Sequence, residues 1–134
     1  MYSVKEVSEI LNISPHTIRY YTDQGLVPHL KRNQNNNRLF DDESIDWLKG
    51  CIYLRELGLS MKDVKSFVEL CLQDSDEAIK QRYQILKDNE LKAKDELEKA
   101  KVRYEYLKSK SKRQLDFIGH HDLDNKNPAQ KYKK

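Results

Sequence analysis

The stretch that decides the fold is SPHTIRYYTDQGLVP, residues 14–28. Ser14 can cap the N-terminus of a helix, and Pro15 stands at the first helical position, where its missing N–H costs nothing. Gly25 can adopt the left-handed conformation that closes a helix at its C-terminus. The stretch therefore predicts a short helix with both ends marked.

Side chains that suit DNA lie between these two ends. His16 carries an imidazole, Thr17 a hydroxyl, Arg19 a guanidinium and Tyr20 a phenol. On an ordinary packed helix the same polar residues would be incidental, so the neighbouring segments must decide between the two interpretations. We assign Tyr21 to the core, because consecutive residues of a helix face different ways.

A second short helix precedes this one. Ser3 and Glu6 have the spacing of a capping box, and apolar residues between positions 4 and 11 share one face. Only Asn12 and Ile13 separate the two helices, so the helices must cross at a steep angle. Two short helices in this order are the layout of a helix-turn-helix.

The segment that follows is basic and rich in asparagine. Its cations are Lys31, Arg32 and Arg38, and no acid occurs between residues 24 and 40. Asparagine tolerates positive φ, so the cluster at 33–37 predicts the tip of a loop or short β-hairpin. Because the first 73 residues carry 9 cations and 10 anions, nucleic-acid binding would depend on this local patch and Arg19. The alternative is a solvated loop.

Two further helices are expected after the basic segment. Asp41 or Asp42 can cap the first, which runs to Leu57 and whose wide apolar face predicts a central position. The second begins within residues 60–63 and ends near Gln73.

A long helix is predicted from residue 76 to 118, where there is neither proline nor glycine and the apolar residues follow a seven-residue repeat. Such a repeat is typical of a coiled coil, and a helix this long needs a partner to cover its apolar face. We therefore expect a homodimer. The candidate dimerisation residues are Ile79, Tyr83, Leu86, Leu97, Tyr104 and Leu107. Residues 119–134 are polar and predict a disordered tail.

Composition limits the remaining classes. Charged residues make up 35% of the 134, which suits one domain with an elongated extension. No apolar run is as long as a membrane span, no signal-peptide pattern is present, and two cysteines are too few for a disulfide framework. We expect a cytoplasmic protein. No nucleophile–base pair or phosphate-binding glycine loop stands out, so we expect neither an enzyme nor a cofactor.

The order of these elements resembles the MerR family of bacterial transcription regulators. Residues 17–21 followed by 25–28 look like the recognition-helix motif of that family, and 38–40, RLF, occupy the place of its wing. Residues 54–60, LRELGLS, look like the corner between its third and fourth helices. The resemblance covers residues 1–72 closely and the long helix by architecture only.

The resemblance implies a fold. We expect a mainly α protein with a winged helix-turn-helix DNA-binding domain over 1–73, whose wing is a small β-hairpin. A long dimerisation helix over 74–118 would form an antiparallel coiled coil, and 119–134 would be the tail.

The resemblance also implies a mechanism at the bacterial nucleoid. Such proteins bind as dimers to a palindromic promoter operator, then bend and untwist it so that RNA polymerase engages both promoter elements. Bending a site of this size costs on the order of 1–6 kcal/mol, which protein–DNA contacts must repay. Within this mechanism, His16 and Thr17 would reach base edges, and Arg19 and Tyr20 would hold phosphates. The other expected backbone contacts are Lys31, Arg32, Arg38 and Lys62.

The sequence leaves the effector open. Metal-sensing relatives use cysteines in and after the dimerisation helix, and residues 76–134 contain none, so we expect no metal site. Another branch is thought to sense electrophiles through a cysteine on the third helix, which makes Cys51 and Cys71 candidate redox sensors. Core packing is the preferred alternative, because a buried cysteine behaves as a small hydrophobe. With no separate ligand domain, a small-molecule effector would bind at the dimer interface or the coil ends.

Two other functions remain open. One is an architectural or excision factor that bends DNA without activating a promoter, which the position of its DNA site would reveal. The other is an adaptor built on the coiled coil, which failure to bind any duplex at low salt would favour. No motif specifies the operator, the target genes, or activation as against repression.

Overall fold

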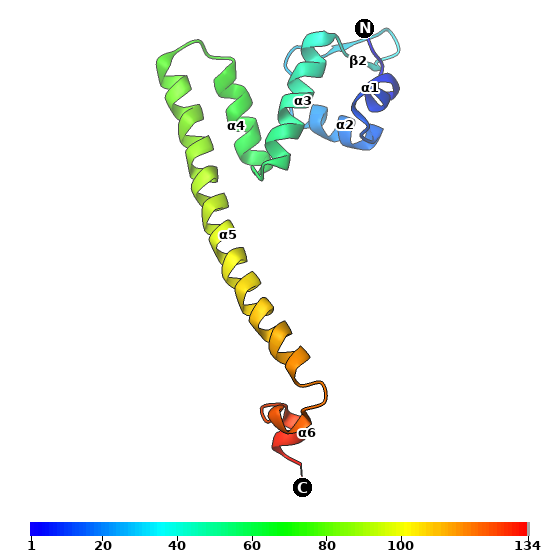
Figure 1. Ribbon diagram of the computed structural model, residues 1–134. Coiled ribbons are helices and arrows are strands. Elements are labelled where there is room, and N and C mark those ends of the chain that lie inside the picture. The colour runs from blue at the N-terminus through cyan, green and yellow to red at the C-terminus, as the bar shows by residue number, and fades with distance from the viewer. Residues whose placement is uncertain (134) are drawn as a thin grey trace. The chain divides into compact units, whose positions relative to one another are not determined.

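The computed structural model describes residues 1–133 and is mainly helical, with one small antiparallel hairpin, as predicted (Figure 1). The elements are α1 (Val4–Leu11), α2 (Pro15–Asp23), β1 (Lys31–Arg32), β2 (Arg38–Leu39), α3 (Asp42–Glu56), α4 (Met61–Cys71), α5 (Asp76–Asp116), the 3-10 helix η1 (His121–Leu123) and α6 (Pro128–Lys131). Within 1–133, no helix combines the length and apolar character needed to cross a bilayer. The chain divides into two compact units, 1–90 and the part from 91 onward.

Side-chain caps fix where the first four helices begin. At each start a hydroxyl or carboxylate oxygen accepts a backbone N–H three residues further on, at 2.8–3.1 Å. The capping residues are Ser3, Ser14, Asp41 and Ser60. Ser3 and Glu6 complete a reciprocal capping box, since the Ser3 N–H also donates to the Glu6 carboxylate at 3.1 Å. The predicted helix starts are therefore confirmed.

The core consists of two apolar clusters that meet at α3. The first joins α1, α2 and the hairpin to α3, through residues that include Val7, Ile18, Phe40 and Leu48. The second joins α3 to α4 and is composed of Leu26, Cys51, Leu59, Val64 and Val68. Because α3 contributes to both clusters, its predicted central position is confirmed.

The first compact unit includes the beginning of α5, as far as residue 90. Ala78 of α5 is 1% exposed, and Ile85 packs against the second cluster. The Asn89 side-chain amide donates to the Asp63 carboxylate at 3.1 Å. The first turns of α5 are thus part of the same compact unit as α4.

The C-terminal segment, which its composition predicts to be a disordered tail, contains two short helices. As far as residue 133, the structure places η1 and then α6 in it. The Asn127 side chain accepts the Ala129 N–H at 3.0 Å, and Pro128 occupies the first helical turn. A local cap of this kind suffices to form one helical turn, and overall polarity does not reveal it.

Candidate DNA interface

Hydrogen bonds and buried side chains hold the joint between α1 and α2. Asn12 adopts the left-handed conformation, with φ 54°, and ends α1. The Ser8 hydroxyl donates to the Ile13 carbonyl at 2.5 Å. Val7 and Ile18, one from each helix, are completely buried. The orientation of α2 against α1 is therefore fixed by hydrogen bonds and by packing together.

Helix α2 presents three of its four predicted DNA-contacting residues to solvent. His16 and Arg19 are exposed, and Tyr20 is 45% exposed. Thr17 is half-buried, and its hydroxyl lies 2.8 Å from the hydroxyl of Ser14. Thr17 is therefore part of the helix cap in the free protein. To bind a base, its hydroxyl must keep or give up the contact with the Ser14 hydroxyl.

Tyr21 belongs to the core, as predicted. It packs against both apolar clusters. Its ring centroid lies 6.0 Å from that of Tyr20, with the planes inclined at 41°. The exposed phenol of Tyr20 is thus held against a core residue.

The predicted hairpin forms around the asparagine cluster. Lys31 pairs with Leu39, and Arg32 with Arg38. At the tip, the Asn33 side-chain oxygen accepts two backbone N–H groups, at 2.9 and 3.0 Å. Asn36 has φ 62°, a conformation that asparagine tolerates. The tip is therefore built by asparagine side chains, as the sequence indicates.

A backbone bridge and a buried ring attach the base of the hairpin to the core. Tyr2 and Phe40 exchange two backbone hydrogen bonds, at 2.7 and 2.8 Å. The Phe40 side chain is completely buried in the first cluster. Phe40 therefore anchors the returning strand to the core.

Arg38 bonds to α2 rather than extending freely into solvent. Its guanidinium donates to the Asp23 carboxylate at 2.6 Å, and only 17% of the Arg38 side chain is exposed. The buried Nε of Arg38 has no hydrogen-bond partner among the described residues. This contact joins the hairpin to the last residue of α2. Sequence reasoning missed Asp23, because no local pattern links residues fifteen positions apart.

The other wing cations differ in how they are held. The Arg32 guanidinium donates to the Asn36 carbonyl at 2.9 Å, so it also supports the tip of the hairpin. Both Arg32 and Lys31 are exposed. Lys31 and Arg32 are therefore the accessible cations of the wing.

The corner between α3 and α4 places one more predicted cation. Gly58 has φ 101°, and the Arg55 guanidinium donates to the Leu59 carbonyl at 2.8 Å. Lys62 follows the Ser60 cap, in the first turn of α4, and is exposed. Its position suits the contact to a phosphate that was expected of it.

The predicted dimerisation residues are uncovered in the single chain. Their exposed fractions run from 40% for Leu86 to 69% for Leu97, and the others are Ile79, Tyr83, Tyr104 and Leu107. On a different face of α5, Ala78 is buried and Ile85 packs against the second cluster. Sequence reasoning missed this second face, although the small Ala78 and the apolar Ile85 seven residues later were its signal.

The two cysteines differ in accessibility. Cys51 is 2% exposed, its thiol donates to the Leu26 carbonyl at 3.7 Å, and burial raises its pKa to about 11. Cys71 is half-buried, and its sulfur accepts a hydrogen bond from Arg82 at 3.7 Å. Both line an apolar cavity of about 280 Å³ between α3 and α4. The environment of Cys51 is that of a core residue. Among residues 1–133, no three His, Cys, Asp or Glu side chains gather into a potential metal site.

A helix-turn-helix, a hairpin wing attached to its second helix and a long apolar-striped helix together define a winged helix-turn-helix regulator. The MerR HTH family regulatory protein model matches residues 2–70. The chain belongs to this family, which confirms the resemblance seen in its motifs.

Two relatives are named as HTH-type transcriptional regulators. An uncharacterised HTH-type transcriptional regulator of Haemophilus influenzae is 30% identical over 109 residues, which are 81% of this chain and 80% of that protein. The uncharacterised HTH-type transcriptional regulator YyaN of Bacillus subtilis is 33% identical over 69 residues, 52% of this chain and 50% of YyaN. The match thus spans about half the length of YyaN.

A solved structure resembles nearly the whole chain. It is HiNmlR, described as a MerR family regulator lacking the sensor domain and bound to promoter DNA. The likeness covers 92% of this chain and 97% of HiNmlR, with 26% sequence identity and a TM-score of 0.69.

Proposed function

We propose that this protein is a sequence-specific transcriptional regulator that binds promoter DNA as a homodimer and bends and untwists it. The observation that carries the proposal is the Arg38–Asp23 contact, which joins the wing to α2 and so presents two DNA-contacting elements as one surface. The free energy spent on bending DNA is repaid by protein–DNA contacts, which here come from the wing and from α2.

Each side chain has a role in this proposal. His16 reads base edges at the N-terminal end of α2, and Thr17 assists it. Arg19 and Tyr20 bind phosphates beside them, while Lys31 and Arg32 hold the flanking backbone. Arg38 contributes by positioning the wing through its bond to Asp23. Lys62 binds a phosphate at the second corner.

The apolar stripe of α5 supports the homodimer. Six apolar side chains at heptad spacing are exposed in the single chain. A second protein surface must cover them before they can be removed from water. A two-fold dimer presents two recognition helices to half-sites about one helical turn, roughly 34 Å, apart. Such a dimer matches a palindromic operator.

The relatives support the regulatory part of the proposal. HiNmlR lacks a sensor domain and was captured on promoter DNA. By analogy, RNA polymerase is the machinery that responds to the distorted promoter here. No catalytic role is proposed, and a small-molecule effector, if one acts, binds at the dimer interface or near the coil ends.

A salt titration of DNA binding tests the recognition helix. Arg19→Ala should weaken binding to every duplex and reduce the slope of log affinity against log salt by about 0.9, the value for one phosphate contact. The matched control is Lys92→Ala, an exposed cation on α5, which should leave the slope unchanged. An unaltered slope in Arg19→Ala would remove this residue from the interface.

Base reading and DNA bending need separate measurements. His16→Ala should change the selected operator sequence rather than weaken binding uniformly, because base-edge contacts carry specificity. Circular-permutation mobility of the bound fragment measures the bend. A bent site between promoter elements supports the proposal. A bent site unrelated to any promoter would favour the architectural or excision factor, and straight DNA would overturn the bending mechanism.

A further inference from the structure

An apolar cavity lies between α3 and α4, within the first compact unit. Its volume is about 280 Å³, and the rings of Trp47, Tyr53 and Phe67 line it together with Leu54 and Val68. An apolar cavity of about 150 Å³ is already large enough to bind benzene. The cavity between α3 and α4 therefore has room for a molecule of one aromatic ring with a substituent.

The walls of this cavity carry almost no charge. Among the described residues that line it, Asp46 alone is an acid or a base, and this residue is exposed. Apolar walls offer water few hydrogen-bond partners, so water inside the cavity is readily replaced by an apolar molecule. A carboxylate at the edge acts against a ligand that is itself an anion. The chemistry of the walls therefore suits an uncharged aromatic molecule.

Gly50 lines the same cavity from the middle of α3. Glycine destabilises a helix interior relative to alanine. Its φ is not positive, and a Cβ built on Gly50 would meet no atom of the chain within 4 Å. Neither the backbone conformation nor packing within the chain requires glycine at this position. The missing side chain does leave the cavity open, which gives the glycine a reason.

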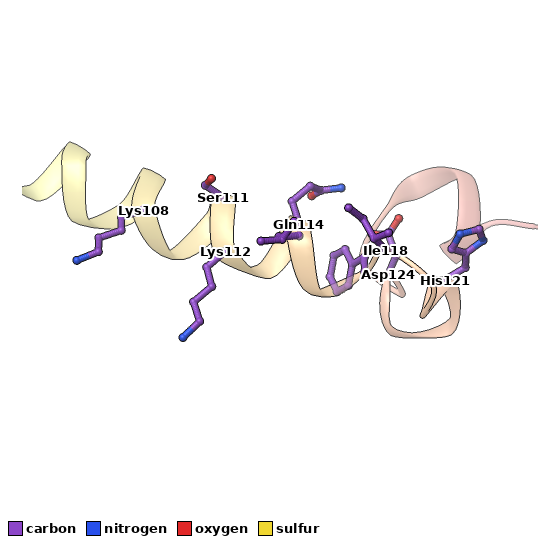
Figure 2. Close-up of a pocket in the computed structure, with 9 residues that line it drawn as sticks. Lys108, Ser111, Lys112, Gln114, Ile118, His121 and Asp124 are labelled. Atoms are coloured by element: carbon purple, nitrogen blue, oxygen red, sulfur yellow. The ribbon is translucent and has the colours of Figure 1, made fainter.

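The larger hollow at the C-terminal end of α5 has a different character. It measures about 920 Å³ and is open to solvent, and its lining includes Lys108, Lys112 and Asp124. Figure 2 shows the two lysine side chains extending away from the helix, so they do not close around a space. An open hollow that carries charges of both signs does not enclose an apolar molecule.

The cavity between α3 and α4 is connected to the recognition helix through Cys51. Cys51 and Val68 belong both to the cavity wall and to the second apolar cluster. The Cys51 thiol donates to the carbonyl of Leu26, which is completely buried just after the end of α2. A molecule in the cavity therefore contacts the same wall against which the end of α2 is held.

We propose that this cavity binds a small uncharged aromatic molecule, and that its occupancy changes the affinity of the protein for DNA. Binding would shift the packing of α3 against α4 and, through Cys51, the position of α2. The cavity is a further location for an effector, apart from the dimer interface and the coil ends considered above. The effect on DNA rests on the proposed function, whereas the binding itself does not.

Trp47 reports on the cavity directly, because it is the single tryptophan of the chain and lines the wall. Toluene titrated into the full chain should change the Trp47 fluorescence saturably, with a dissociation constant of about 1 mM or lower. Benzoate has the same ring with a negative charge and should bind at least about tenfold more weakly. A wild-type chain that shows neither a saturable fluorescence change nor a heat of binding with toluene would overturn the proposal.

A filled cavity locates the site. Gly50→Leu should weaken toluene binding at least about tenfold while the chain stays folded, because leucine favours a helix more than glycine does. Lys49→Leu is the matched control, since Lys49 is exposed on α3 beside Gly50 and does not line the cavity. Urea unfolding would verify the fold of both variants. Toluene that binds Gly50→Leu as tightly as the wild type would have its site elsewhere and would overturn the proposal.

Thiol labelling locates the ligand independently. Cys71 lines the cavity and is half-buried. Saturating toluene should slow its reaction with iodoacetamide at least about threefold in the wild type and leave the rate unchanged in Gly50→Leu. Loss of toluene binding as the chain associates would mean that a side chain of the partner subunit fills the cavity, which would also overturn the proposal.

DNA binding with and without toluene separates the two proposals. Saturating toluene should change the operator affinity of the wild type at least about threefold and leave that of Gly50→Leu unchanged. Toluene that binds in the cavity without changing operator affinity would overturn the effector role. A chain that binds no duplex in the absence of toluene would overturn the proposed function, while binding in the cavity would remain measurable by Trp47 fluorescence.

Discussion

In the protein without DNA, the charged guanidinium of Arg38 is already bonded to Asp23. Its guanidinium donates to Asp23 at 2.6 Å, and most of the side chain is buried. From the sequence alone, Arg38 has the same status as Lys31 and Arg32, since all three lie in one basic segment. The acid that distinguishes it is far away in the sequence and adjacent in the fold.

A double-mutant cycle measures this contact. Arg38→Gln and Asp23→Asn should each lower the free energy of unfolding, and together they should cost less than the two single effects added. The expected coupling is about 1 kcal/mol, because Asp23 is largely exposed. Additive effects in urea unfolding would show that the two side chains act independently.

The Asp41 cap gives a pH dependence of defined sign. The Ser44 backbone N–H, donated to the carboxylate, lowers the Asp41 pKa in the folded state. A lowered folded pKa adds stability above the unfolded pKa, near 3.9, and this stability is lost as pH falls through the folded value. Asp41→Ala should therefore melt below wild type at pH 7, and the gap should close towards pH 2. A gap independent of pH would exclude the charged cap.

The thiols should react at very different rates. With a pKa of about 11, only about one in a thousand Cys51 side chains is a thiolate at pH 8, and the residue is buried. Iodoacetamide should label Cys71 first in the native protein, as mass spectrometry of peptides would show. Equal labelling of Cys51 in the native state would contradict its core environment and revive it as a sensor.

At the level of elements, local chemistry determined what could be predicted. Helix starts depend on a capping side chain and its neighbours, so Ser3, Ser14 and Ser60 revealed them directly. The hairpin tip followed from asparagine at positions that need positive φ. The second face of α5 was missed, because the longer heptad pattern of the exposed face outweighs the short signal of Ala78 and Ile85. Which helix packs there depends on contacts distant in the sequence.

The hairpin tip allows a test at this scale. Asn36 has φ 62°, which glycine adopts freely and a β-branched residue does not. Asn36→Val should lower the free energy of unfolding by about 1–2 kcal/mol and weaken DNA binding, while Asn36→Gly should change both little. Equal behaviour of the two variants would mean that the tip relaxes to another conformation.

At the level of the whole molecule, stability and association should be linked. If the stripe on α5 is covered only in a dimer, the melting temperature of the wild type should rise with protein concentration. Leu97→Asp should abolish that dependence and reduce operator affinity towards that of a single head, whereas Lys99→Asp, two positions away and outside the stripe, should not. Calorimetry over a hundredfold concentration range would measure this. A constant melting temperature in the wild type would contradict dimerisation.

The sequence predicts which structural elements are present better than it predicts which of them pack into one compact unit. Motifs marked the recognition helix, wing, corner and long helix, whereas the first compact unit also includes the start of α5, where Ile85 packs against the second cluster and Asn89 bonds to Asp63. Such boundaries are set by packing between segments. No single stretch contains that information.

The bond between Arg38 and Asp23 has a consequence for the thermodynamics of binding. A wing that is already fastened to its neighbour has little freedom left to lose when a duplex arrives, so association should carry a smaller entropic penalty than for a hairpin that becomes ordered on contact. Calorimetric titration with Arg38→Gln should then show a more unfavourable entropy change, even where the measured affinity shifts only slightly.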